Sequence, residues 1–255
     1  MVGVIGAGWP AAPAGSRPGR RVELGRGGGL AASTAQAQIG VVSGAGRRAM
    51  PARSGPALTV AEHEVLAWLS EQYAAPLVQV AVAMGRAERS ARRSVARLKA
   101  AGLVEAGSVL ARGGVWVWLT ARGQRLAGTG FSPWRMRPGL LGHIAAVNEV
   151  RLHISRRAPD AVWMCERQLA RDAARRDAHL PDGLVVVGGE RHAIEVELTP
   201  KARVRTTAII SELVAGHDAV VYFCARRARP ALDELAAGGQ YPELFVRDLP
   251  TAVGA

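Results

Sequence analysis

The sequence predicts an α/β (α+β) fold in which a basic tail precedes two folded units. Three features support this prediction. Residues 1–57 are rich in Gly, Ala, Pro, Ser and Arg and hold too few large apolar side chains to form a core. Apolar residues at helical spacing follow in residues 58–128, and helix-like and strand-like patterns alternate over residues 139–250. The length of 255 residues fits one or two domains, so the internal pattern decides the count.

The net charge of +12 is concentrated in the tail and the first folded unit. It amounts to +6 over residues 1–57, +4 over 58–128 and +2 over 129–255, and nearly all of the basic residues are arginine. Such an excess favours an extended anionic partner, and nucleic acid fits best. A solvated surface, or the arginine bias of a GC-rich genome, would produce much of the same excess.

Nothing in the sequence predicts secretion or membrane insertion. The N-terminus lacks a charged start followed by an apolar stretch, and no apolar run approaches the roughly 18 residues of a membrane span. Cys165 and Cys224 lie in apolar runs without a CxxC or mixed Cys/His spacing. We therefore expect a cytoplasmic protein, without membrane contact, whose cysteines are reduced core residues.

The first folded unit begins with three predicted helices. Thr59 can cap the first helix, and Pro76 opens the second. The second helix carries apolar residues at i, i+3, i+4 and i+7, namely Leu77, Val80, Ala81 and Met84. The third helix runs over about residues 88–101 and ends at Gly102.

The third helix has an apolar face and a basic face. Ala91, Val95 and Leu98 form its inner stripe, and the residues that project outward are Arg89, Arg92, Arg93 and Arg97. A short strand at residues 103–105, a turn at 113–114, a return strand at 115–119 and a helix over 120–127 follow. This order is that of a winged helix-turn-helix, whose third helix can enter the major groove of DNA.

The candidate DNA-binding residues are cations on and around this helix and in the hairpin: Arg86, Arg89, Arg92, Arg93, Arg97, Lys99 and Arg112. They can bind phosphates or the guanine edge of duplex DNA while the hairpin touches the backbone. Alternatively, they form a solvated face of a protein-interaction module. Trp116 and Trp118 are interpreted as hairpin core, because Val115 and Val117 make both faces of the strand apolar.

The second folded unit alternates helices and strands in the order αβββαβ. A helix with Leu140, Ile144, Val147 and Ile154 leads to strands at 161–165, 184–187 and 192–198, the last two joined at Gly188-Gly189. Thr199 and Pro200 then start a helix whose apolar face holds Ile209, Ile210, Leu213 and Val214. A strand over residues 219–224 follows.

Three carboxylates are expected to meet in this second unit. Asp182 opens one strand, and Glu195 and Glu197 share a face of the next, because side chains alternate along a strand. Such a cluster is repulsive unless a cation neutralises it, and its hard oxygens suit Mg²⁺ or Mn²⁺. Lys201, expected one turn into the following helix, could supply a positive charge.

A noncatalytic interpretation of the same residues stays open. Glu195 and Glu197 could simply form ion pairs with basic residues of the next helix, namely Lys201, Arg203 or Arg205. His179 and His192 lack regular metal-ligand spacing and are interpreted as incidental.

The motif resembles the PD-(D/E)XK nuclease superfamily. Pro181-Asp182 is followed, after twelve residues, by Glu195-Val196-Glu197. The resemblance implies that Asp182 and Glu195 ligate the metal, which would polarise the scissile phosphate and activate a water. Glu166, near the end of the preceding strand, is a further candidate ligand.

Glu197 stands where this superfamily usually has lysine. Some active members carry glutamate there, and in others the lysine migrates to the adjoining helix, where Lys201 would serve. The same departure is also compatible with an inactive, DNA-holding relative.

Residues 58–248 resemble the replication-relaxation family of actinobacterial proteins. The resemblance rests on Gly142-His143, Asn148, the segment 179–183 (HLPDG) and the segment 195–201 (EVELTPK), with a closing strand at 220–224. It implies a role in the replication or mobilisation of plasmids and integrative elements, with double-stranded DNA as partner. Other replication or mobilisation proteins, and a second copy of this chain, are the further partners considered.

Three functions compete on these grounds. The first is a DNA-binding protein of plasmid replication or transfer. The second is a Mg²⁺- or Mn²⁺-dependent DNA endonuclease that uses Asp182, Glu195, Glu197 and Lys201. The third is a winged-helix transcriptional regulator with a noncatalytic C-terminal domain.

Overall fold

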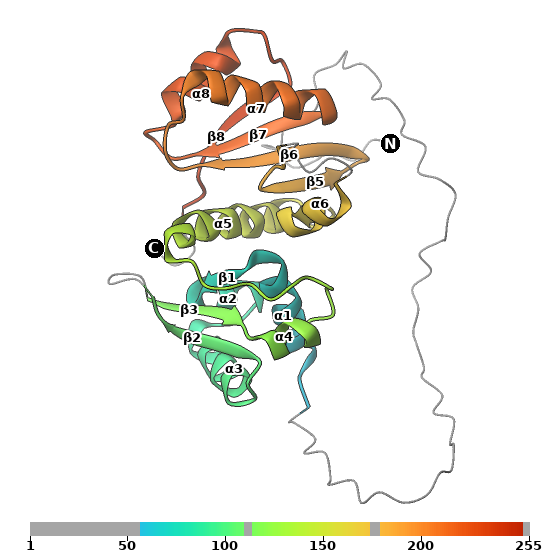
Figure 1. Cartoon of the computed structure of the whole chain (residues 1–255), viewed down its shortest axis with the longest axis vertical. Coiled ribbons are helices and arrows are strands. Elements are labelled where there is room, and N and C mark those ends of the chain that lie inside the picture. The colour runs from blue at the N-terminus through green and yellow to red at the C-terminus, as the bar shows by residue number, and fades with distance from the viewer. Residues whose placement is uncertain (1–56, 110–113, 174–178, 252–255) are drawn as a thin grey trace, which may run out of the picture.

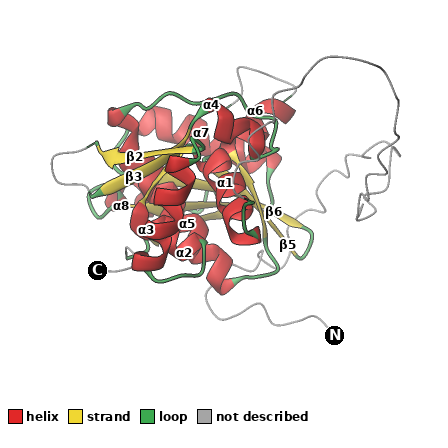
Figure 2. Cartoon of the chain, turned by 90° about the horizontal axis from the view of Figure 1, so that it is seen from below, coloured by secondary structure: helices red, strands yellow, loops and turns green. Residues whose placement is uncertain are grey.

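The computed structural model describes residues 57–109, 114–173 and 179–251, which form a mixed α/β structure with two sheets. Residues 1–56 of the expected tail lie outside the described residues. Seen from below, the strands of both sheets lie among the helices (Figure 2). In the described part of the chain, no helix is long and apolar enough to cross a membrane.

The first unit consists of helices packed on a small antiparallel sheet of order β1-β3-β2. Its helices are α1 (Val60–Gln72), α2 (Leu77–Ala83), α3 (Glu88–Ala100) and α4 (Ala121–Leu126). Its strands are β1 (Ala74–Pro76), β2 (Val104–Ser108) and β3 (Val115–Leu119). Helix α1 begins as the sequence predicts, because the Thr59 side chain accepts a hydrogen bond from the Glu62 backbone and Glu62 accepts one from the Thr59 backbone.

The core of this unit agrees with the helical periodicity. The inner stripe of α3, predicted as Ala91, Val95 and Leu98, is buried. Strand β1 was not predicted, because three residues are too few to show a strand period. Trp116 is buried, but it belongs to a cluster with residues of α5 and not only to the hairpin.

The second unit is a five-stranded sheet of order β4-β5-β6-β7-β8, antiparallel from β4 to β6 and parallel from β6 to β8. Its strands are β4 (Val162–Cys165), β5 (Gly183–Val187), β6 (Glu190–Glu197), β7 (Ala219–Cys224) and β8 (Leu244–Asp248). Its helices are α5 (Leu141–Arg157), α6 (Glu166–Asp172), α7 (Arg203–Gly216) and α8 (Arg229–Ala237), and the short 3₁₀ turn η1 (Pro138–Leu140) precedes them.

The predicted order of helix, three strands, helix and strand is present, with α6 inserted and α8 and β8 added. The turn between β5 and β6 lies at Gly188-Gly189 as expected, and both glycines have positive φ, as a two-residue hairpin of this kind requires. The two expected core cysteines are free and buried.

Two sequence predictions about helix starts are wrong. Helix α7 begins at Arg203, so Lys201 lies in the preceding loop and not one turn inside the helix. Leu140 is 44% exposed in η1, and the buried stripe of α5 begins one residue later at Leu141.

Helix α5 lies between the two units (Figure 1). Val150 and Ile154 pack with the sheet of the second unit, while Leu141 and Ile144 pack with Ala74 and Trp116 of the first. Both faces of α5 are therefore buried, so its apolar residues are not confined to one stripe.

A buried polar network fixes α5 to the first unit. The Asn148 amide donates to the backbone oxygen of Ala74 at 2.9 Å and to Gln79 Oε1 at 3.1 Å. Gln79 Nε2 in turn donates to the backbone oxygen of Ala145 at 2.8 Å and to Glu149 Oε2 at 3.1 Å. Since buried polar groups that lose their partners are costly, this network opposes any separation of the units.

Gly123 and Gly142 provide a matched test of packing in the two units. A Cβ at Gly123 would lie 1.8 Å from the backbone oxygen of Leu103, whereas a Cβ at Gly142 would meet nothing within 4 Å. We expect Gly123→Ala to lower the free energy of unfolding by about 1–3 kcal/mol or more, because backbone must move. Gly142→Ala should leave it unchanged or raise it by up to about 1 kcal/mol. Chemical denaturation measures both, and equal losses would contradict the described packing.

Candidate functional site

Asp182 is held at the start of β5 by two hydrogen bonds. Its Oδ2 accepts from the backbone N–H of Val196 at 2.8 Å, and its Oδ1 lies 2.8 Å from Nε2 of His143 on α5. The backbone pairing between β5 and β6 begins at Gly183 and Ile194. The Asp182 side chain therefore accepts a hydrogen bond from a β6 backbone N–H that lies outside this pairing. The carboxylate is thereby fixed where α5 and β6 approach each other.

Glu195 and Glu197 share a face of β6, as the strand alternation predicts. Their partners in register on β7 are Tyr222 and Cys224, which pack towards α7 and α8. Glu195 Oε1 lies 2.9 Å from Nε2 of His179. Glu197 Oε2 lies 2.6 Å from Nζ of Lys201. Each glutamate is therefore buried with a basic partner.

Opposing effects act on the pKa of Glu195. Burial raises its pKa above the ordinary value, and the negative charge of Asp182 acts in the same direction. The hydrogen bond from His179 and the charge of Lys201 act against this rise. The two candidate metal ligands are thus close enough to affect each other electrostatically.

Tyr222 was not singled out by the sequence, yet its hydroxyl lies among the carboxylates. Burial raises its pKa, and so do the charges of Glu195, Glu197 and Asp182. Its Oη is buried and has no hydrogen-bond partner among the described residues. Because native proteins rarely leave such a group unpaired, this hydroxyl is an unusual feature of the acidic cluster.

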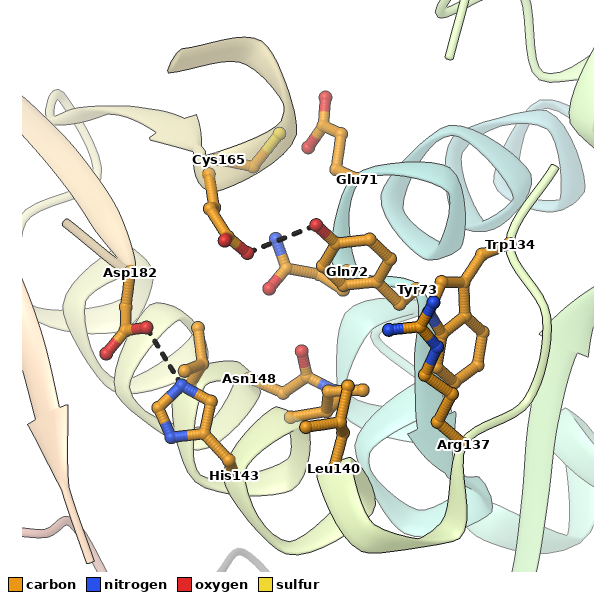
Figure 3. Close-up of a pocket in the computed structure, with 13 residues that line it drawn as sticks. Glu71, Gln72, Tyr73, Trp134, Arg137, Leu140, His143, Asn148, Cys165 and Asp182 are labelled. Carbon is orange, nitrogen blue, oxygen red and sulfur yellow. Dashed lines mark hydrogen bonds and ion pairs between the residues drawn. The ribbon is translucent and has the colours of Figure 1, made fainter. Parts of the chain in front are cut away.

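The structure separates Glu166 from Glu195 and Glu197. Glu166 is the first residue of α6 and accepts a hydrogen bond from the Tyr73 hydroxyl at 3.1 Å. It lines a cavity of about 360 Å³ between the two units (Figure 3). Asp182 and His143 also line this cavity, whereas Glu195, Glu197 and Lys201 do not. Asp182 is the residue that links the cavity to the acidic cluster.

The chemistry of the donors fits Mg²⁺ or Mn²⁺, because both ions prefer carboxylate oxygens. The present side-chain positions fit less well, since among the described residues no three His, Cys, Asp or Glu side chains are arranged to hold one metal ion. Asp182 and Glu195 are each bound to a histidine. An ion at these two carboxylates would have to replace those contacts.

The sequence does not mark two histidines of the site as functional residues. His179 was interpreted as incidental, and His143 was noted only for the family resemblance, yet they contact Glu195 and Asp182. The available signal was that His179 lies three residues before Asp182. His192 is buried elsewhere and lies 3.1 Å from Glu190.

The cations of α3 differ in how strongly the protein holds them. Arg97 forms an ion pair with the fully buried Glu62 of α1 and therefore joins two helices. Lys99 donates to the backbone oxygen of Ala106 at 2.8 Å, and Arg92 pairs with Glu88 at 2.6 Å.

The remaining candidate cations have weaker attachments. Arg93 donates to Ser90 at 3.1 Å and Arg86 to Ser94 at 3.4 Å. Arg89 is exposed and has no hydrogen-bond partner among the described residues. Arg112 lies outside the described residues.

The sequence matches no protein-family model, and no curated protein is significantly similar to it.

The two site histidines should make the stability of the protein depend on pH. The hydrogen bond to Asp182 raises the pKa of His143, and that to Glu195 raises the pKa of His179, above the ordinary 6.5. A raised histidine pKa contributes stability that is fully present below the unfolded value and is lost as pH rises through the folded value.

In metal-free buffer we therefore expect the stability that these two histidines contribute to be lost as pH rises above their ordinary pKa of 6.5. In chemical denaturation, the difference in free energy of unfolding between the wild type and the double variant His143→Gln/His179→Gln should shrink as pH rises, because His153 and His217, whose pKa values burial lowers, contribute equally to both proteins. Imidazole titration by NMR gives an independent check, and pKa values at or below 6.5 for both histidines would contradict the described contacts.

Proposed function

We propose that this chain binds double-stranded DNA and acts in the replication or mobilisation of a plasmid or integrative element. The observation that carries the proposal is the outer face of α3, where five basic residues and one acidic residue occur within thirteen positions. Figure 1 shows α3 at the end of the molecule opposite to α7 and α8, so that the five-stranded sheet does not cover it. A long anionic molecule could approach this helix.

The order of elements around α3 supports a winged helix-turn-helix. Helices α1, α2 and α3 are followed by the antiparallel pair β2 and β3. In this arrangement α3 would enter the major groove and the hairpin would lie along the sugar-phosphate backbone. Arg89, Arg92 and Arg93 lie in the N-terminal half of α3, which is the part that usually contacts base edges.

The cations would then have different roles. Arg89 and Arg93 are the best candidates for contacts with phosphates or guanine, because few internal contacts hold them. Arg97 would chiefly hold α3 against α1 through Glu62. The resemblance to replication-relaxation proteins supports the plasmid context, while a transcriptional regulator would use the same helix in the same way.

DNA binding predicts a specific effect of two arginines. The double variant Arg89→Ala/Arg93→Ala should bind a labelled duplex at least about tenfold more weakly than the wild type, because each good base contact contributes about 1–3 kcal/mol. If the lost contacts are to phosphates, the slope of log affinity against log salt should fall by about one per contact.

Fluorescence anisotropy at low salt measures these effects. The double variant Arg156→Ala/Arg157→Ala removes the same charge from exposed positions at the end of α5 and serves as the control. An equal loss in both variants would show only a general charge effect, and no binding by the wild type at low salt would refute the proposal.

Metal-dependent DNA cleavage is a second candidate function. It is favoured by the charges of Asp182, Glu195 and Glu197, all of which act on the Tyr222 hydroxyl, a group without a hydrogen-bond partner among the described residues. Asp182 and Glu195 would hold Mg²⁺ or Mn²⁺, which when bound would polarise a scissile phosphate and activate a water. The ion pair between Glu197 and Lys201 instead favours the noncatalytic alternative.

Cleavage and metal binding separate these alternatives. An active site predicts that the wild type nicks plasmid DNA in Mn²⁺ and that Asp182→Asn abolishes the activity, because Asp182 would lose its charge as a ligand. Asp160→Asn, at an exposed turn of the same unit, is the control. Equal cleavage by the wild type and Asp182→Asn would indicate contamination, and calorimetry without a heat of Mn²⁺ binding would favour a noncatalytic domain.

A further inference from the structure

The cavity between the two units is built from segments that are far apart in the chain. Tyr73 follows α1, Trp134 and Arg137 precede α5, Asn148 lies within α5, and Glu166 and Asp182 come from the second unit. Figure 3 shows Tyr73, Trp134, Arg137, Asn148 and Asp182 around this space. At about 360 Å³, it lies at the small end of the range of roughly 300–1,000 Å³ typical of ligand pockets.

Two aromatic rings form one wall of the cavity. The ring centroids of Tyr73 and Trp134 are 5.7 Å apart, with an angle of 48° between the planes. Tyr73 has φ 69° and ψ −58°, a strained conformation for a residue other than glycine. Such strain persists only where the surroundings enforce it, and it occurs often at functional sites.

Several contacts hold the Tyr73 ring in place. The guanidinium of Arg167 lies 4.9 Å from the ring centroid and also donates to the backbone oxygen of Ser70 at 2.6 Å. The hydroxyl of Tyr73 donates to Glu166. The Tyr73 ring is therefore held in place with Arg167 over it, so that a flat ligand in the cavity would stack on Trp134.

Asn148 gives the cavity an unused acceptor. Its side chain is fully buried, and its amide nitrogen already donates to Ala74 and Gln79. Its Oδ1 is buried and has no partner among the described residues. A ligand that presents an N–H group to this oxygen would satisfy it, and the carboxylates of Glu166 and Asp182 also favour a ligand with donors over a bare anion.

We propose that this cavity binds one unpaired nucleotide of a DNA strand. Its base would stack on Trp134, beside the Tyr73 ring, and donate an N–H group to Asn148, while Arg137 would face the phosphate. A nucleobase combines the flat face with the N–H donors that these walls require. A cavity of this size excludes a base pair, so the strand must be unpaired at this point. The inference rests on the proposed function, because it names the kind of DNA that this chain would bind.

The test compares two duplexes of equal sequence, one blunt and one with a single-stranded extension of about four nucleotides that carries 2-aminopurine. The full-length protein is used in EDTA, so that a metal does not contribute. We expect tighter binding of the extended duplex by roughly fivefold to a hundredfold, together with quenching of the 2-aminopurine fluorescence, because one stacked base contributes on this scale.

Variants of the segment before α5 test whether the preference for the extended duplex arises in the cavity. Trp134→Ala should abolish the preference for the extended duplex and leave the affinity for the blunt duplex unchanged, whereas Trp134→Phe should retain it. Met136→Ala is the matched control, because Met136 packs in the same cluster but does not line the cavity. Arg137→Ala, at an exposed position, should weaken the preference even if Trp134→Ala does not fold.

The outcomes separate this inference from the proposed function. Equal affinity for both duplexes, or a preference that survives Trp134→Ala and Arg137→Ala, overturns the inference while duplex binding stands. If no duplex binds, the proposed function fails. Quenching of 2-aminopurine fluorescence in a single-stranded oligonucleotide would still support the cavity assignment if the quenching depends on Trp134. Displacement by a free deoxynucleoside monophosphate at similar affinity overturns the assignment to a strand.

Discussion

The burial of α5 on both sides is the constraint on which the rest of the structure depends. A helix with one apolar face would leave the two units as separate bodies, but α5 packs with the five-stranded sheet through Val150 and Ile154 and with the first unit through Leu141 and Ile144. The polar residues Asn148 and Glu149 are also buried there, and contacts with Gln79 and the Ala74 backbone compensate for their lost hydration. Because these hydrogen bonds are directional, they fix the rotation of α5 as well as its position.

The candidate site follows from this position of α5. His143, in the first turn of the helix, meets the carboxylate of Asp182, whose other oxygen is held by the backbone of Val196 in β6. The same turn of α5 forms one wall of the cavity, and the strained Tyr73 at the end of α1 forms another. The acidic cluster and the cavity are thus two sides of one junction, with Asp182 between them.

Charge is distributed so that different parts of the molecule favour different partners. The outer face of α3 is basic and far from the sheet of the second unit, whereas Asp182, Glu195 and Glu197 gather beside β6 and β7. The acidic cluster is balanced internally by His143, His179 and Lys201. These basic partners reduce the repulsion among the three carboxylates. If the site is catalytic, a bound metal ion would have to replace the contacts of the carboxylates with these partners.

The sequence by itself determined the features that depend on local geometry. Helical periodicity identified the buried stripe of α3, the capping residue Thr59 fixed the start of α1, and strand alternation placed Glu195 and Glu197 on one face. Tertiary structure decided which distant groups meet. His143 reaches Asp182 across 39 residues, and the cavity joins segments of both units, because only packing of α5 brings them together. The sequence likewise does not predict the short strand β1 or the position of Lys201 in a loop, because strand pairing and tertiary packing determine both.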